Sequence, residues 1–134
     1  MIKKKVFGIF VLVIMITSVL VIPVVAVDFT DTFGKMSLTS STDVESSVYY
    51  LPEATHYTVV HFSSMTTAGY YYLGFTQRLG DGTFGGKASQ KATLSSLTMD
   101  RKYNFELSKN YHKEFIKGST AVGTISRVTL SNNQ

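Results

Sequence analysis

A period-two alternation of apolar and polar residues constrains the fold of this chain more than any other feature. Along residues 103–108, Tyr103, Phe105 and Leu107 alternate with polar neighbours, as in a β-strand with one buried face. Turn residues separate this run from other strand-like runs at residues 36–40, 48–51, 57–62 and 121–130. The pattern predicts an all-β protein, a single small antiparallel β-sandwich of about six to eight strands.

The N-terminal segment has the composition of an export signal. Three lysines at residues 3–5 precede an uncharged apolar run over residues 6–22, and Pro23 interrupts that run. We predict a secretory signal helix over residues 1–26, cleaved between Ala26 and Val27, and a β-sandwich domain over residues 27–134. An uncleaved membrane anchor is the alternative, because the apolar run is long enough to span a bilayer. In both cases the three lysines stay on the cytoplasmic side of the membrane, and the domain lies on the extracellular side.

Charge and cysteine content narrow the class of protein. The full chain has a formal net charge of +4, but without the three N-terminal lysines the remainder is nearly neutral, so we expect no nucleic-acid partner. The chain has no cysteine, which excludes disulfides and thiol nucleophiles and favours a Gram-positive bacterial exporter. Residues 27–47 are polar, and we expect them to be partly loose.

The stretch GYYYLGFTQRLGDGTFGG, residues 69–86, contains the pattern G-x-G-x-x-G at Gly80, Gly82 and Gly85. A dinucleotide-binding loop would need a helix to begin directly after these glycines. The following residues have no apolar helical stripe. We therefore predict a β-hairpin whose turn is Gly80-Asp81-Gly82, with Asp-Gly favouring a primed turn.

The first arm of this hairpin has one apolar and one amphipathic face. Tyr71, Leu73, Phe75 and Leu79 share a face that we assign to the core. The other face carries the residues of a candidate binding surface, which are Tyr70, Tyr72 and Arg78. Exposed tyrosines beside an arginine are typical of contact hot spots.

A second candidate lies at residues 109–117, which we interpret as a basic-aromatic loop with a turn at residues 110–113. Its candidate residues are Lys109, Tyr111, Lys113 and Lys117. Such a loop could meet an anionic polymer or lipid. The alternative is ordinary charge pairing, because residues 28–60 carry a net charge of −4 and residues 78–127 a net charge of +5.

Residues for catalysis or metal binding are sparse. His56 and His61 are five residues apart. On a regular strand this odd offset would point them to opposite faces, so they could not share a metal. Ser63 and Ser64 lie near His61 in sequence, but a catalytic triad is defined by geometry. We predict no catalytic residue, cofactor or metal site.

The sequence thus favours a secreted, non-enzymatic binding or interaction protein. Its partner would be a cell-surface polymer or a protein, and it would meet a membrane only through the signal segment. The alternative is a bacteriocin-like toxin that acts on neighbouring cell envelopes.

Overall fold

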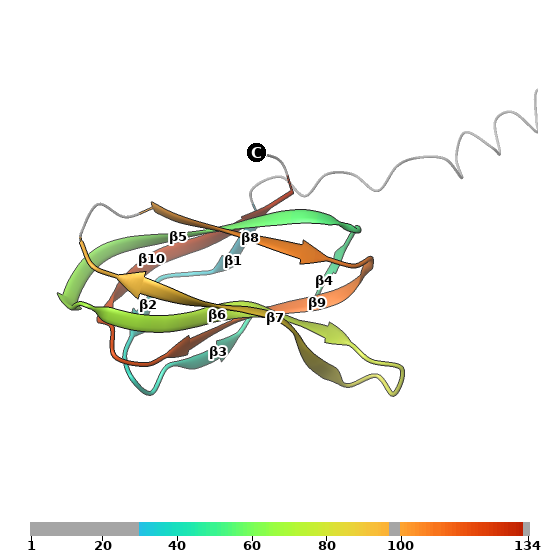
Figure 1. The fold of residues 1–134 in the computed structure, drawn as a ribbon, viewed down its shortest axis with the longest axis horizontal. Coiled ribbons are helices and arrows are strands. Elements are labelled where there is room, and N and C mark those ends of the chain that lie inside the picture. The colour runs from blue at the N-terminus through green and yellow to red at the C-terminus, as the bar shows by residue number, and fades with distance from the viewer. Residues whose placement is uncertain (1–29, 97–99, 133–134) are drawn as a thin grey trace, which may run out of the picture.

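The structure, a computed structural model, describes residues 30–96 and 100–132 (Figure 1). The predicted signal helix and its cleavage site lie outside these residues. No helix within the described ranges is long and apolar enough to cross a membrane. The described residues form two antiparallel sheets, so the all-β prediction is confirmed.

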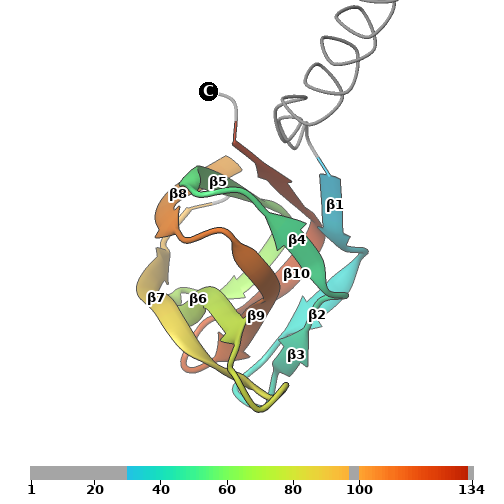
Figure 2. The ribbon, with the colours of Figure 1, turned by 90° about the vertical axis from the view of Figure 1, so that its right-hand side faces the viewer.

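The two sheets form two facing layers (Figures 1 and 2). Sheet A has the order β1-β10-β5-β8, and β2 also pairs with β10. Sheet B has the order β3-β9-β6-β7, and β4 also pairs with β9. The strands of sheet A are β1 (Thr30–Phe33), β2 (Met36–Leu38), β5 (Ala54–Thr67), β8 (Asp100–Leu107) and β10 (Val122–Ser131), and those of sheet B are β3 (Asp43–Glu45), β4 (Tyr49–Leu51), β6 (Gly69–Arg78), β7 (Phe84–Leu94) and β9 (Asn110–Gly118).

The described residues thus contain ten strands rather than the predicted six to eight. The difference arises at one edge of each sheet, where two short strands share a single neighbour. These short strands, β1 to β4, lie between Thr30 and Leu51. Half of residues 30–47, which we expected to be partly loose, therefore pair with β10 or β9 at the sheet edges.

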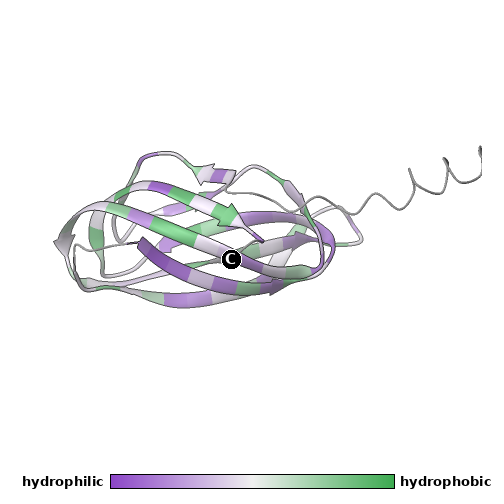
Figure 3. Cartoon of the chain, turned by 90° about the horizontal axis from the view of Figure 1, so that it is seen from above, coloured by the Kyte–Doolittle hydropathy of each residue, from purple (hydrophilic) through white to green (hydrophobic). Residues whose placement is uncertain are grey.

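The hydrophobic core lies between the two sheets. Phe105 of sheet A packs against Phe75 of sheet B, with ring centroids 5.1 Å apart. Phe62 and Tyr71 form a second contact of this kind, at 5.6 Å. Hydrophobic and hydrophilic residues alternate along the strands (Figure 3), so each sheet has one covered face and one face toward solvent.

Strand β6 has the predicted orientation over most of its length. Tyr71, Leu73 and Phe75 are fully buried, whereas Tyr70 and Tyr72 are exposed. The assignment of Leu79 to the core is wrong, because this residue is 44% exposed. It follows the last residue of the strand, where alternation no longer determines which way a side chain points.

The G-x-G-x-x-G stretch forms the predicted hairpin, because β7 continues as a strand through Gly85 where a nucleotide loop would need a helix. The turn is not of the primed type. The Gly82 N–H donates to the Leu79 carbonyl at 3.0 Å, so Gly80 and Asp81 are the central residues. Gly80 does not have a positive φ, whereas Gly82 has a φ of 86°. The connection resembles a turn followed by one left-handed residue.

The interpretation of residues 109–117 as a loop with a turn at 110–113 is also wrong. Residues Asn110–Gly118 are strand β9, which lies inside sheet B between β6 and the short strands β3 and β4. Of the four candidate residues, only Lys109 lies outside this strand, in the connection after β8.

Candidate functional site

The two sequence-predicted candidate surfaces lie side by side on one face. Strands β6 and β9 are antiparallel neighbours, and their register places Lys117 opposite Tyr72 and Lys113 opposite Thr76. These residues alternate with buried ones, so they point away from the core. Residues about 40 positions apart in the sequence therefore form one continuous surface on the outside of sheet B.

At one end of this surface, three side chains stack across three strands. Tyr50 of β4 is paired with Tyr111 of β9, and their rings lie 4.8 Å apart. The Arg78 guanidinium from β6 lies 5.5 Å from the centre of the Tyr111 ring. The aromatic faces and the cation attract each other, which holds the arginine against the sheet.

The remaining cations of the surface also lie over aromatic rings. Lys91 Nζ is 3.9 Å from the Tyr70 ring centre, and Lys113 Nζ is 4.7 Å from that of Phe84. Lys117 Nζ lies 5.7 Å from the Phe115 ring centre. Each lysine can lay its apolar stem along a ring while its ammonium group stays hydrated.

Exposed aromatic area is concentrated on this side of the molecule. Tyr50, Tyr70, Tyr72 and Tyr111 are each between 38% and 46% exposed, and all four lie on the outer surface of sheet B. The other large apolar side chains with comparable exposure among the described residues are Val48 and Leu79, which flank β4 and β6. We call this surface the aromatic-basic face, with the residues Tyr50, Tyr70, Tyr72, Arg78, Phe84, Lys91, Tyr111, Lys113, Phe115 and Lys117.

Gly74 of β6 lies at the centre of the aromatic-basic face and is buried. It is paired with Phe115 on one side and with Ser89 on the other, and a Cβ atom there would lie only 2.0 Å from the Ala88 carbonyl oxygen. This close approach requires glycine. Beside it, a shallow notch of about 230 Å³ is lined by Phe115, Ser89 and other residues of β7.

Acidic residues occur at one edge of this face. Glu45 of β3 forms an ion pair with Lys113, at 3.5 Å, and Asp43 is paired in register with Lys117. Arg78 and Lys91 lie away from this edge and form no ion pair with a described residue. The face therefore keeps a positive charge around its exposed tyrosines.

Sequence reasoning missed three residues of the face, which are Tyr50, Phe84 and Lys91. Tyr50 could have been found, because it alternates with Leu51 in a recognisable strand. Phe115 lies among the basic residues of 109–117 in the sequence, whereas Lys91 carries no local signal for a site. Lys91 joins the face because strand pairing places it beside Tyr72.

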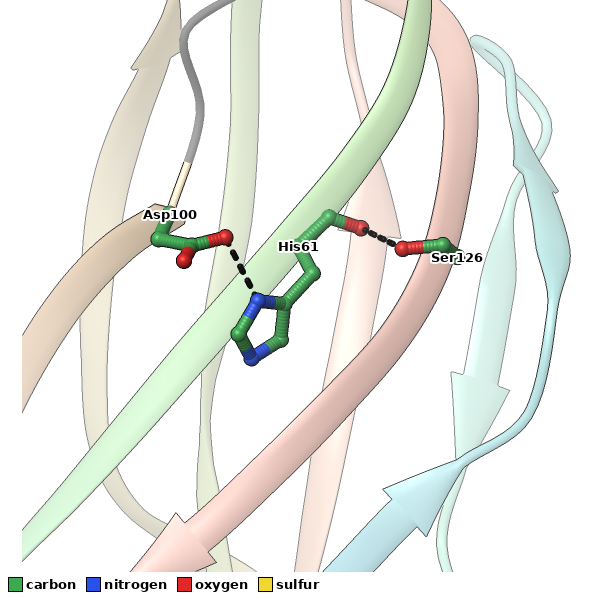
Figure 4. Close-up of polar contacts among 3 residues, drawn as sticks. All are labelled: His61, Asp100 and Ser126. Atoms are coloured by element: carbon green, nitrogen blue, oxygen red, sulfur yellow. Dashed lines mark hydrogen bonds and ion pairs between the residues drawn. The ribbon is translucent and has the colours of Figure 1, made fainter.

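The histidines and serines do not form a catalytic triad within the described residues. His61 Nδ1 contacts Asp100 Oδ1 at 2.5 Å, and no serine bonds to this imidazole (Figure 4). Ser126 instead donates to the backbone carbonyl of His61 at 3.0 Å, and Ser63 donates to the Thr124 carbonyl. His56 is buried on the opposite face of β5, as predicted. No group of three or more potential metal ligands occurs within residues 30–96 and 100–132.

Comparison of the chain with protein-family models, curated proteins and solved structures gave no match. The case for a function therefore depends on the geometry of the site.

Proposed function

We propose that this chain is an exported β-sandwich protein of a Gram-positive bacterium that binds an anionic polysaccharide of the cell envelope and catalyses no reaction. The observation that carries the proposal is the aromatic-basic face, where four exposed tyrosines and four cations lie on one sheet surface. Exposed aromatic area that is concentrated on one face favours a contact surface over ordinary solvation.

The residue types suit a charged sugar polymer. Tyrosine rings offer apolar area, with a hydroxyl group at the edge, at a low entropic cost, so they can stack on sugar rings. Arg78 and Lys91 can form charge-assisted hydrogen bonds with carboxylate or phosphate groups along the same polymer. The tyrosines and cations are spread over four neighbouring strands of sheet B, which suits an extended chain better than a compact ligand, because a compact ligand usually binds in a concave site.

Export supports this partner. The N-terminal residues have the order of a secretory signal, with basic residues, an apolar run and a small-residue cleavage site before Val27. An uncleaved segment would hold the domain on the outer side of the membrane. In either case the aromatic-basic face would be exposed to the cell envelope.

The test is co-sedimentation of residues 27–134 with isolated Gram-positive cell walls. We expect binding that survives protease treatment of the walls, weakens as salt is raised, and is lost when anionic polymers are extracted. The double variant Tyr70→Ala/Tyr72→Ala should reduce binding by about tenfold or more. Its matched control is Tyr57→Ala on sheet A, because Tyr57 also carries a lysine over its ring, at 4.3 Å.

Three results would contradict the proposal. Loss of binding after protease treatment would identify a protein partner. Equal weakening by Tyr57→Ala and by the Tyr70/Tyr72 double variant would show that the effect is not specific to sheet B. Killing of intact Gram-positive cells at concentrations that saturate binding would favour the toxin alternative.

A further inference from the structure

The outer surface of sheet A, on the other side of the molecule, contains a depression of about 640 Å³. This volume is within the range of small-molecule sites. It extends over four strands, because its lining includes Asp31 of β1, Arg127 of β10, His61 of β5 and Asp100 of β8. Val59 of β5 adds an apolar patch between the charged side chains.

A row of three paired residues crosses this depression. In the sheet register, His61 lies opposite Arg127 on one side and opposite Asp100 on the other. Asp100 contacts Nδ1 of the imidazole (Figure 4) and so fixes the orientation of the ring. When Nδ1 carries the hydrogen that it donates to Asp100, Nε2 is an acceptor. No described residue hydrogen-bonds to Nε2.

Two charged groups remain available on the β10 side of His61. The Arg127 guanidinium has no ion pair or hydrogen bond within the described part of the chain, and neither has the Asp31 carboxylate. Lys102 also lines the depression, but its ammonium group lies over the Tyr57 ring. With two acidic and two basic side chains, the lining suits a ligand with one negative charge better than a multiply charged anion.

We propose that this depression binds a small carboxylate that also carries hydroxyl groups, such as an acidic monosaccharide. Arg127 binds the carboxylate through paired N–H donors. Nε2 of His61 accepts a hydrogen bond from one ligand hydroxyl, and Asp31 accepts one from another. Val59 packs against the apolar side of the sugar ring. This site is separate from the aromatic-basic face and does not depend on its function.

The test is an NMR titration of the full-length, isotope-labelled chain, purified in a polyoxyethylene detergent. The probes are glucuronate, which has both features of the ligand, acetate, which lacks the hydroxyl groups, and glucose, which lacks the carboxylate. We expect saturable shifts of the Val59, His61 and Arg127 signals with glucuronate, at an affinity about tenfold or more above that for acetate or glucose.

Two variants locate the site. Arg127→Gln and His61→Phe should each weaken glucuronate binding by about tenfold or more. Lys109→Gln, which removes a positive charge in the exposed connection after β8, should leave it unchanged. The proposal is overturned if glucuronate binds no better than acetate, if inorganic phosphate binds more tightly at the same residues, or if Arg127→Gln has no effect. Shifts confined to Tyr70 and Tyr111 would also overturn it, because they would place the sugar on the aromatic-basic face.

Discussion

A buried carboxylic acid makes the stability of this protein depend on pH. Glu114 of β9 points into the core, and its side chain is fully buried. Neither of its carboxylate oxygens accepts a hydrogen bond of normal distance and angle from a described residue. Burial raises the pKa of Glu114 to about 7, and the nearby hydroxyl groups of Thr32 and Thr58 offset only part of this effect. The protonated acid is therefore the form that the folded core prefers.

The size and sign of the effect follow from the difference between the folded and unfolded pKa values. A rise from the ordinary 4.5 to about 7 corresponds to about 3 kcal/mol of unfolding free energy. Because the folded pKa is the higher one, the folded state binds the proton more tightly. This contribution is complete below pH 4.5 and is lost as pH rises through 7.

Urea unfolding of residues 27–134 at pH 4.5 and pH 8.5 measures this effect, with Glu114→Gln as the reference. The variant cannot ionise, so the stability of wild type relative to Glu114→Gln should fall by about 3 kcal/mol between the two pH values. Burial lowers the pKa of His56, so this residue makes the unfolding free energy rise with pH. Its contribution cancels in the comparison, because His56 is present in both wild type and Glu114→Gln. A difference that stays constant with pH would refute the reasoning.

Three further predictions concern export, the core and the turn. Export with cleavage after Ala26 predicts that the intact mass of the protein from culture supernatant begins at Val27, and a full-length, membrane-retained product would contradict it. Phe75 is fully buried against Phe105, so Phe75→Ala should lower the unfolding free energy by about 3–5 kcal/mol. An unchanged melting temperature would contradict this. Gly82→Val places a β-branched residue at a φ of 86° and should destabilise the protein by about 1–3 kcal/mol in denaturant unfolding, without a change in nucleotide binding.

Local alternation was enough to predict the class of fold and the orientation of β6. A strand that covers a core on one side must place every second residue inward, so the sequence alone separates Tyr71 and Phe75 from Tyr70 and Tyr72. The prediction was wrong at Leu79, because the strand ends one residue earlier and the side-chain direction then depends on the turn.

Alternation of apolar and polar residues does not predict which face of β9 is buried. Its larger apolar residues, Tyr111 and Phe115, face outward, while His112 and Glu114 are buried. A local pattern would reverse these faces, because it assigns apolar residues to the core. Tertiary contacts determine the orientation instead. The single N–H of a neutral His112 ring can donate to a backbone carbonyl oxygen, either that of Ser108, 2.8 Å from Nε2, or that of Thr76, 3.2 Å from Nδ1. This bond offsets part of the cost of burying the polar ring.

The sequence by itself therefore determined the all-β class and supplied two sets of aromatic and basic residues, and it predicts an export signal. Only the tertiary structure decided that these sets form one surface, because β6 pairs directly with β9. The same is true of the sheet A depression, where β5 brings His61 between Arg127 and Asp100. Strand pairing joins residues that are distant in the chain, and the global packing of the two sheets selects their register. Local propensity carries no information about that choice.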